Sequence, residues 1–158
     1  MEKIDSAEIT IQSSIQECDS HVNRIRKVLN NINIHKPVLE KEIKNDENDI
    51  VAKIDQLIYR FTKLQDSMGT RLYPSLYTIL EGNNKIIPFL DILNRLEKLG
   101  VITSVSDWQF FRNLRNNLAH DYPDSLGKTV ETINLLISEI EKLIDMFNHA
   151  KNYYIERS

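Results

Sequence analysis

The segment RNNLAHDYP, residues 115 to 123, brings a cation, an imidazole and a phenol close together in the chain. His120 can take up or release a proton near neutral pH, because the ordinary pKa of histidine is about 6.5. Arg115 offers a planar, permanent charge that matches two phosphate oxygens at once. Asn116 can orient the imidazole or bind RNA through its amide. These residue types suit acid–base cleavage of a phosphodiester.

The same residues also have a purely structural interpretation. A histidine in the last turn of a helix can bond the free carbonyls there and complement the helix dipole. Arg115 could then be a surface ion pair, and Tyr122 could pack on the neighbouring helices. The spacing alone leaves both interpretations open.

Helix geometry adds a constraint to the catalytic interpretation. Arg112, Asn116 and His120 follow one another at steps of four residues and share one helix face, so Arg112 is a candidate RNA contact. Arg115 lies about 140° from His120 around an ideal helix. The two side chains can therefore meet on one ligand only if the helix end is distorted or a second subunit contributes.

The sequence does not predict a metal site. No carboxylate pair stands at ligand spacing beside His120, and the histidines are scattered. They are His21, His35, His120 and His149. We therefore expect neither a metal ion nor another cofactor.

The composition indicates one soluble domain. The 158 residues are enough for a hydrophobic core, and 41% of them are apolar. The single cysteine, Cys18, excludes an internal disulfide and is expected to be a small apolar residue on a helix. The charged start MEKIDSAEIT does not resemble a signal peptide, and no apolar run is long enough to cross a membrane. We expect a cytoplasmic protein without membrane contact.

The charge of the chain limits the kind of nucleic-acid binding that is plausible. A net charge of −3 argues against a general nucleic-acid coat protein, which is normally strongly basic. It does not exclude a small basic site. The stretch from Trp108 to His120 contains two arginines and no acidic residue, so it is a local island of positive charge.

Residues 1–35 predict one long helix. Apolar or small residues recur there at steps of three or four, the spacing of a single helical stripe. They are Ile4, Ala7, Ile11, Ile15, Cys18, Val22, Ile25, Leu29 and Ile32. This narrow stripe suits an ordinary bundle helix or, alternatively, a dimerisation arm.

Residues 48–155 predict the rest of the bundle. A helix begins near Asp49, and Gly69 is placed where this helix would end or bend. The last helix is expected from about residue 124 to residue 154. No strand-like alternation of useful length occurs, so the fold class is all-α. We expect an up-and-down bundle of four to five main helices in a single domain, residues 1–158.

A helix start is predicted shortly before the motif. Ser104 or Ser106 can begin this helix, and Ser106 with Gln109 three residues later resembles a capping box. Phe110 and Phe111 supply apolar contacts beyond it. The motif therefore lies toward the end of a helix.

The sequence from Arg115 to Tyr122 resembles the R-x4-H-x-Y signature of HEPN-domain toxins of the HepT type. Asn116 fits the polar residue that is common at the first x position. The segment RFTKLQDSMG, residues 60–69, is similar to the middle helix of these proteins. The resemblance covers most of the chain, roughly from residue 48 to residue 150, and implies a HEPN-like helical fold.

The resemblance implies a metal-independent endoribonuclease that acts as a homodimer, with two copies of the motif meeting in a cleft. His120 would be the acid–base group on the ribose 2′-hydroxyl, Arg115 would hold the scissile phosphate, and Asn116 would position both. The products would be a 2′,3′-cyclic phosphate or 3′-phosphate end and a 5′-hydroxyl end. A homodimer would also satisfy the geometric constraint on Arg115 and His120, because the partner can complete the site.

A toxin–antitoxin module is implied as well. Toxins of this type are encoded beside a minimal nucleotidyltransferase antitoxin, which transfers AMP units from ATP to the motif tyrosine. AMPylation of Tyr122 would place phosphate charge and bulk beside His120 and Arg115 and so exclude RNA. The structural alternative is an unmodified Tyr122 that fixes the helix end.

Two other functions remain open. The chain could be a non-catalytic helical partner that binds the nucleotidyltransferase and presents a substrate to it. It could also be a plain helical scaffold that uses residues 1–32 as a dimerisation arm. A polar strip of Arg60, Lys63, Gln65 and Asp66 faces either the cleft or solvent.

Overall fold

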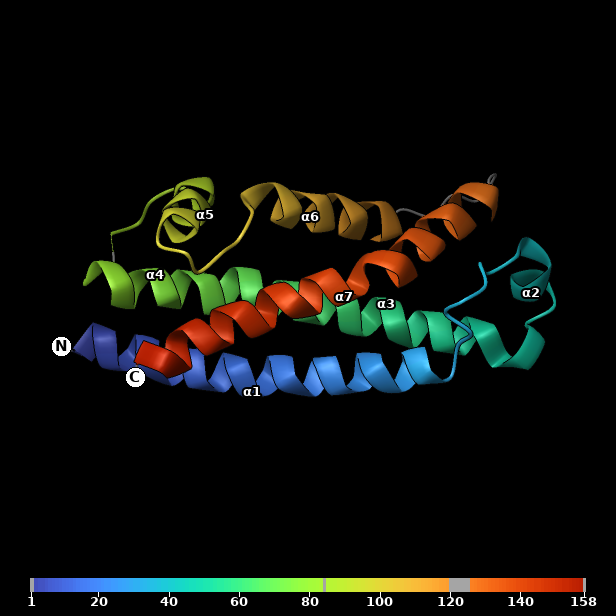
Figure 1. Ribbon diagram of the computed structural model, residues 1–158, viewed down its shortest axis with the longest axis horizontal. Helices are drawn as coiled ribbons and strands as arrows, with labels where there is room; N and C mark the ends of the chain where they lie inside the picture. The colour runs from blue at the N-terminus through green and yellow to red at the C-terminus, as the bar shows by residue number, and fades with distance from the viewer. Residues whose placement is uncertain (1, 84, 120–125, 158) are drawn as a thin grey trace.

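The computed structural model describes residues 2–83, 85–119 and 126–157, which form a helical bundle (Figure 1). Its α-helices are α1 Glu2–Asn30, α2 Glu40–Lys44, α3 Ile50–Ser67, α4 Tyr73–Glu81, α5 Phe89–Lys98, α6 Val105–Ala119 and α7 Leu126–Arg157. The long segments alternate in direction (Figure 1). Helices α1 and α6 run in one direction along the bundle, and α3, α4 and α7 run in the opposite direction. The described residues contain no strand. The predicted all-α, up-and-down bundle with a long N-terminal helix is confirmed.

Helix α1 buries its apolar stripe against other helices of the same chain. Ile11, Cys18 and Ile25 have no exposed surface, and Ala7 and Leu29 are also buried. The helix packs chiefly on α3 and α4 and also contacts α7. The stripe is thus used inside the bundle, as in an ordinary bundle helix. Burial raises the pKa of the Cys18 thiol to about 12, which agrees with its predicted role as a small apolar residue.

Helix α1 ends at Asn30, earlier than the predicted end near residue 35. The Asn31 side-chain amide donates to the Lys27 carbonyl at 2.9 Å, which satisfies one of the free carbonyls at the helix end. This local hydrogen bond competes with further helix formation. The apolar stripe nevertheless continues to Ile32, which is buried beyond the helix end.

The connection from α1 to α3 contains α2 and a 3₁₀ turn, Glu47–Asp49, that the sequence pattern did not predict as helical. The Asn134 side chain of α7 holds the first part of this connection, since its amide exchanges hydrogen bonds of 2.8 and 3.0 Å with the Val38 backbone. The non-glycine residues with positive φ that the structure describes all lie in this connection. All are Asp or Asn, the types that tolerate the left-handed conformation.

A π-helical turn, Met68–Leu72, joins α3 to α4 without a break. The Tyr73 N–H donates to the Met68 carbonyl, one residue further back than in an α-helix. Pro74 follows and has no N–H of its own to donate. The helix that was predicted to end or bend at Gly69 therefore continues, and the irregularity at this position is the π-helical turn.

An aromatic contact fixes α6 against this turn. Trp108 is 2% exposed, and its ring centroid lies 5.1 Å from that of Tyr73 and 6.4 Å from that of Phe89. A Cβ atom at Gly69 would lie 3.0 Å from Cζ2 of Trp108. The glycine therefore allows the close approach of two helices rather than ending one of them.

Helix α6 begins at Val105, and Ser104 is its N-cap. The Ser104 hydroxyl oxygen accepts a hydrogen bond from the Asp107 N–H at 3.1 Å. The first of the two predicted starts is confirmed. The capping box of Ser106 and Gln109 is wrong, because both residues lie within the helix.

Helix α7 runs the length of the bundle and extends past residue 154, its predicted end. Its predicted start, at residue 124, lies outside the described residues. Ion pairs join α7 to α1: Lys151 lies 2.9 Å from Asp19, and Arg26 lies 2.7 Å from Glu141. These contacts close the bundle on the side of α1.

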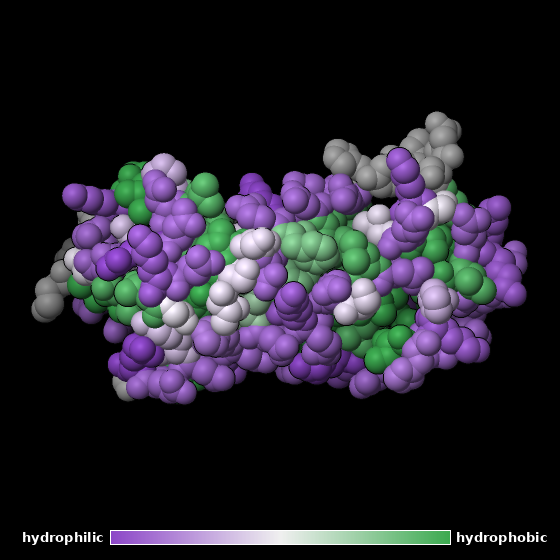
Figure 2. All heavy atoms as spheres, turned by 45° about the horizontal axis from the view of Figure 1, so that its top comes forward, coloured by the Kyte–Doolittle hydropathy of each residue, from purple (hydrophilic) through white to green (hydrophobic). Residues whose placement is uncertain are grey.

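The surface of the bundle is mainly polar. On the face in Figure 2, hydrophilic residues cover most of the area and hydrophobic residues show between them. Phe110 of α6 and Leu135 of α7 are 36% and 41% exposed. None of the helices in the described part of the chain is both long and apolar enough to cross a membrane.

A buried histidine makes the stability of the fold depend on pH. His21 of α1 is 7% exposed, and its Nδ1 lies 3.1 Å from Nη1 of Arg60 on α3. A guanidinium group can only donate, so Nδ1 must be the unprotonated acceptor. Burial, followed by the Arg60 charge, lowers the pKa of His21 below its usual value of 6.5. The unfolded chain therefore binds a proton at His21 more readily than the folded chain.

We predict that the free energy of unfolding falls as the pH is lowered from about 7 to about 5, and that the fall is smaller in His21→Gln. The stability from neutral His21 is present above the unfolded pKa and is lost as the pH drops below it. Urea unfolding at several pH values measures this slope. His35→Gln, at an exposed histidine, is the control and should keep the wild-type slope. An unchanged slope in His21→Gln would contradict the assignment.

Candidate functional site

The C-terminal half of α6 holds the described part of the predicted motif. Arg115 and Asn116 lie near the end of this helix, and Arg112 lies one turn before them. His120 and Tyr122 fall outside the described residues. The structure thus positions the arginine end of the motif, and the roles of His120 and Tyr122 stay predictions.

Arg115 is paired with a carboxylate from another helix. Its Nε lies 3.0 Å from Oδ1 of Asp66, and its Nη2 donates to Oδ2 at 3.2 Å. The Arg115 side chain is 34% exposed and that of Asp66 is 42% exposed. Only the Nη2 contact is a hydrogen bond, since the buried Nε has no hydrogen-bond partner among the described residues despite its distance from Oδ1. A guanidinium can bind two phosphate oxygens at once. Asp66 therefore occupies, in the single chain, one of the donors that the catalytic interpretation assigns to phosphate.

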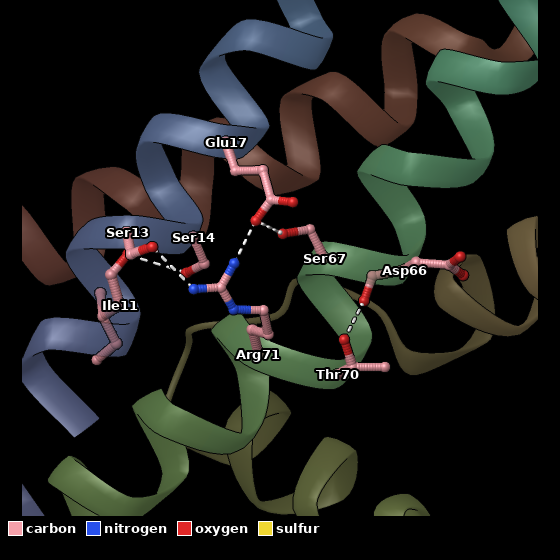
Figure 3. Close-up of polar contacts among 8 residues, drawn as sticks. All are labelled: Ile11, Ser13, Ser14, Glu17, Asp66, Ser67, Thr70 and Arg71. Atoms are coloured by element: carbon pink, nitrogen blue, oxygen red, sulfur yellow. Dashed lines mark hydrogen bonds and ion pairs between the residues drawn. The ribbon is translucent and has the colours of Figure 1, made fainter. Parts of the chain in front are cut away.

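Asp66 lies at the end of α3, just before the π-helical turn. The Thr70 hydroxyl donates to the Asp66 backbone carbonyl at 2.7 Å. Figure 3 shows the Asp66 carboxylate pointing away from the polar contacts that join this turn to α1. The carboxylate instead contacts Arg115 of α6.

Polar contacts with α1 anchor the opposite side of the turn. Arg71 donates to the Glu17 carboxylate and, at 2.8 Å, to the Ser13 hydroxyl (Figure 3). The Ser67 hydroxyl donates to Glu17 at 3.2 Å. Because these bonds fix the turn to α1, the opposite side of the turn faces α6.

A cavity of about 360 Å³ lies beside the Arg115–Asp66 pair. Gln65 and Trp108 line it and are 3% and 2% exposed, and we call these two residues its floor. Phe89 of α5 lines one side and is half-buried. The floor is therefore made by α3 and α6, and the side wall by α5.

Polar residues line the outer part of the cavity, which we call the rim. They are Asp66, Thr70, Arg112, Arg115 and Asn116. Thr70, Arg112 and Asn116 are exposed, so the rim is open to solvent. The cavity thus combines an aromatic and amide floor with a rim that carries two guanidinium groups.

Sequence reasoning found part of this arrangement. Gln65 and Asp66 belong to the strip that was predicted to face either the cleft or solvent, and both line the cavity. Arg60, from the same strip, instead pairs with His21. Trp108 was missed, although its steps of four and seven residues to the two rim arginines place all three on one helix face. The part played by Phe89 of α5 had no signal in the sequence.

The predicted island of positive charge is partly compensated. Asp66 neutralises Arg115, whereas Arg112 is exposed on the rim. Within residues 2–83, 85–119 and 126–157, no group of three His, Cys, Asp or Glu side chains is arranged to hold a metal ion. The rim thus presents the exposed guanidinium group of Arg112 and that of Arg115, whose partner Asp66 another anion could replace.

Comparison of the chain with protein-family models, with curated proteins and with solved structures gives no match. The functional assignment therefore rests on two kinds of observation. One is the motif in the sequence, and the other is the geometry of the cavity and its rim.

We predict that the Arg115–Asp66 pair contributes little to the stability of the fold. A partly exposed ion pair is worth roughly 0–1 kcal/mol, so Arg115→Ala and Asp66→Asn should each lower the free energy of unfolding by less than about 1 kcal/mol. Trp108→Ala is the contrasting control, with an expected loss of about 3–5 kcal/mol from the core. Denaturant unfolding measures all three. A loss of several kcal/mol in Arg115→Ala would show that the pair is structural.

Proposed function

We propose that the chain is the toxin of a toxin–antitoxin module and acts as a metal-independent endoribonuclease of the HEPN type. The observation that carries the proposal is that Arg112, Arg115 and Asn116 line one cavity in the turns of α6 that lead to His120. These are residue types that bind phosphate and RNA. The resemblance of the motif that ends at Tyr122 supports the same reaction.

In the proposed reaction, Arg115 holds the scissile phosphate and His120 transfers protons. The ribose 2′-oxygen attacks phosphorus while its proton passes to one imidazole, and the bond from phosphorus to the 5′-oxygen breaks. A second, protonated imidazole gives its proton to the departing 5′-oxygen. The homodimer supplies both imidazoles, one from each copy of His120. The products are a 2′,3′-cyclic phosphate, which water can open to a 3′-phosphate, and a 5′-hydroxyl.

The other polar groups have separate parts in this reaction. Acid–base catalysis of this kind is typically worth 10²–10⁴-fold in rate. Arg115 stabilises the negative charge that grows on the phosphate oxygens, and Asn116 positions the reacting groups. Arg112 adds a contact to a neighbouring phosphate.

Asp66 must move before a phosphate can bind Arg115 through two oxygens, because its carboxylate accepts from Nη2 and lies 3.0 Å from Nε. The guanidinium group is therefore paired both without RNA, with Asp66, and with RNA bound, with the phosphate. Since the existing pair is partly exposed, breaking it costs little. Asp66 therefore keeps Arg115 oriented toward the cavity until the RNA phosphate replaces it.

Neutralisation acts on the neighbouring tyrosine. A partner nucleotidyltransferase transfers AMP from ATP to the Tyr122 hydroxyl and releases pyrophosphate. The new phosphate competes with RNA for Arg115, and the attached nucleoside blocks the cavity. Because the substrates of these two reactions, ATP and RNA, are found in the cytoplasm, we expect the protein to act there.

A non-catalytic role is favoured by one observation, which is that Asp66 already neutralises Arg115 in the single chain. In that alternative, the chain is a helical partner that binds the nucleotidyltransferase and presents a substrate to it. The Arg115–Asp66 pair would then be a permanent surface contact. The two functions differ in whether the purified protein cleaves RNA.

We predict that unmodified protein cleaves single-stranded RNA in excess EDTA and that His120→Ala does not. The rate should fall by about 10²-fold or more in Arg115→Ala, because the transition state loses a charged donor. Arg26→Ala is the matched control, since Arg26 is also an exposed arginine in an ion pair but lies on α1. The intact mass of each sample shows whether Tyr122 carries AMP.

The outcomes separate the two functions. Absence of cleavage by protein with unmodified Tyr122 would contradict the nuclease and favour the non-catalytic partner. A sample that carries added AMP mass is the neutralised form and is prepared again without the nucleotidyltransferase. Equal cleavage by His120→Ala and wild type would exclude the proposed role of His120.

A further inference from the structure

A strip of cations follows the seam between α1 and α3, which lie side by side (Figure 1). His21 of α1 and Arg60 of α3 meet in this seam at 3.1 Å. Helix α7 contacts the other side of α1, where it pairs with Asp19 and Arg26. The strip consists of Arg24 and Lys27 of α1 and Lys53, Arg60 and Lys63 of α3.

The cations of the strip are not compensated by acidic side chains. Among the residues that the structure describes, none of them forms an ion pair with a carboxylate. Other arginines, such as Arg26 and Arg95, each have a carboxylate partner. Arg60 and Lys63 instead lie 5.2 and 5.6 Å from the ring centroid of Tyr59. The strip therefore concentrates positive charge in a chain whose net charge is −3.

One end of the strip borders an open groove of about 450 Å³ between the two helices. Arg24 and Lys27, which are exposed, and Lys53, which is partly exposed, line this groove. A single carboxylate, that of Asp49, lies among them, and the remaining lining residues are uncharged. Such a surface attracts anions. It is unsuited to face its own copy in a symmetric dimer, because like charges would then meet.

The strip leads to the rim of the cavity beside α6. On α3, Arg60, Lys63 and Asp66 follow one another at steps of three residues. Each step turns by about 60° around the helix, so this row passes from the seam with α1 to the side where Asp66 meets Arg115. From Asp66 back to Lys53 the distance along α3 is about 20 Å, at a rise of about 1.5 Å per residue. The strip is therefore continuous with the rim.

We propose that the strip binds the RNA strand beyond the scissile phosphate, through the phosphate groups of the strand and irrespective of its bases. This inference rests on the proposed function for the identity of the anion. Lysine and arginine side chains supply most of the sequence-independent affinity for nucleic acid, because each phosphate contact releases counterions from the strand. A strand whose phosphate is held at Arg115 meets Lys63 first and then the groove lined by Arg24, Lys27 and Lys53.

The strip variant combines Arg24→Gln, Lys27→Gln and Lys53→Gln in a His120→Ala protein, so that bound RNA stays intact. Fluorescence anisotropy in EDTA measures its affinity for a labelled single-stranded RNA oligomer at several salt concentrations. We expect binding about tenfold weaker or worse than in His120→Ala alone. The slope of log K against log salt should fall in magnitude by about 2, since each phosphate contact on a single strand accounts for about 0.7. The thermal midpoint should not fall, because no ion pair is lost.

A matched control variant replaces three exposed cations outside the strip by glutamine, namely Lys85, Lys98 and Arg157. It changes the net charge by the same amount, so we expect a much smaller loss of affinity and an unchanged salt slope. Equal RNA affinity with and without the strip substitutions would overturn the proposal. An equal loss in the strip and control variants would also overturn it, because net charge alone would then explain the binding.

The length of the ligand separates the strip from the rim. A dinucleotide reaches the rim alone, so the strip variant should bind it nearly as well as His120→Ala does. Homo-oligomers of A and of U should lose similar affinity, because their phosphates are alike. An equal loss for the dinucleotide, or a loss confined to one base, would overturn a strip that follows the strand. Binding to vesicles of phosphatidylserine and phosphatidylcholine, without binding to RNA, would overturn the choice of RNA.

The strip and the nuclease can fail separately. Oligomer affinity that depends on the strip, in a protein whose wild type does not cleave RNA, would keep the strip and reject only the nuclease. Cleavage by the wild type, together with unchanged oligomer affinity in the strip variant, would reject only the strip.

Discussion

The approach of Trp108 to Gly69 sets the geometry of the site. The indole is nearly fully buried beside Tyr73 and Phe89, and a Cβ atom at Gly69 of the π-helical turn would lie only 3.0 Å from it, closer than an ordinary contact. This contact brings α6 against the junction of α3 and α4 and fixes which face of α6 meets that junction. The arginines one and two turns further along the same face are thereby carried to the edge of the cavity.

The electrostatics of the site follow from that approach. The π-helical turn is tied to α1 by Arg71 and Glu17, and its other side presents Asp66 to Arg115. A permanent cation and a carboxylate therefore meet at the rim, where both are still partly hydrated and exchangeable. An anionic ligand can replace the carboxylate without leaving Arg115 unpaired.

The elements of the fold were predictable from local pattern, whereas the irregular parts of the site were not. Apolar residues at steps of three or four, as in α1, report helices directly. The π-helical turn depends on a hydrogen bond from Tyr73 to Met68 and on a contact with Trp108, far along the chain. The pairing of Arg115 with Asp66, 49 residues away, is equally a tertiary event. The sequence therefore indicated Arg115 as a site residue and Asp66 as a residue of the cleft or the surface, but it could not predict that the two side chains pair.

The central claim is that the motif of Arg115 and His120 cleaves RNA through the 2′-hydroxyl without a metal ion. The most direct measurement is the chemistry of the RNA ends after digestion in excess EDTA. The claim predicts 5′-hydroxyl ends with 2′,3′-cyclic phosphate or 3′-phosphate ends, and no cleavage at nucleotides whose 2′-hydroxyl is methylated. Ends with a 5′-phosphate and a 3′-hydroxyl, or cleavage at methylated positions, would contradict it, because both require attack by water rather than by the ribose.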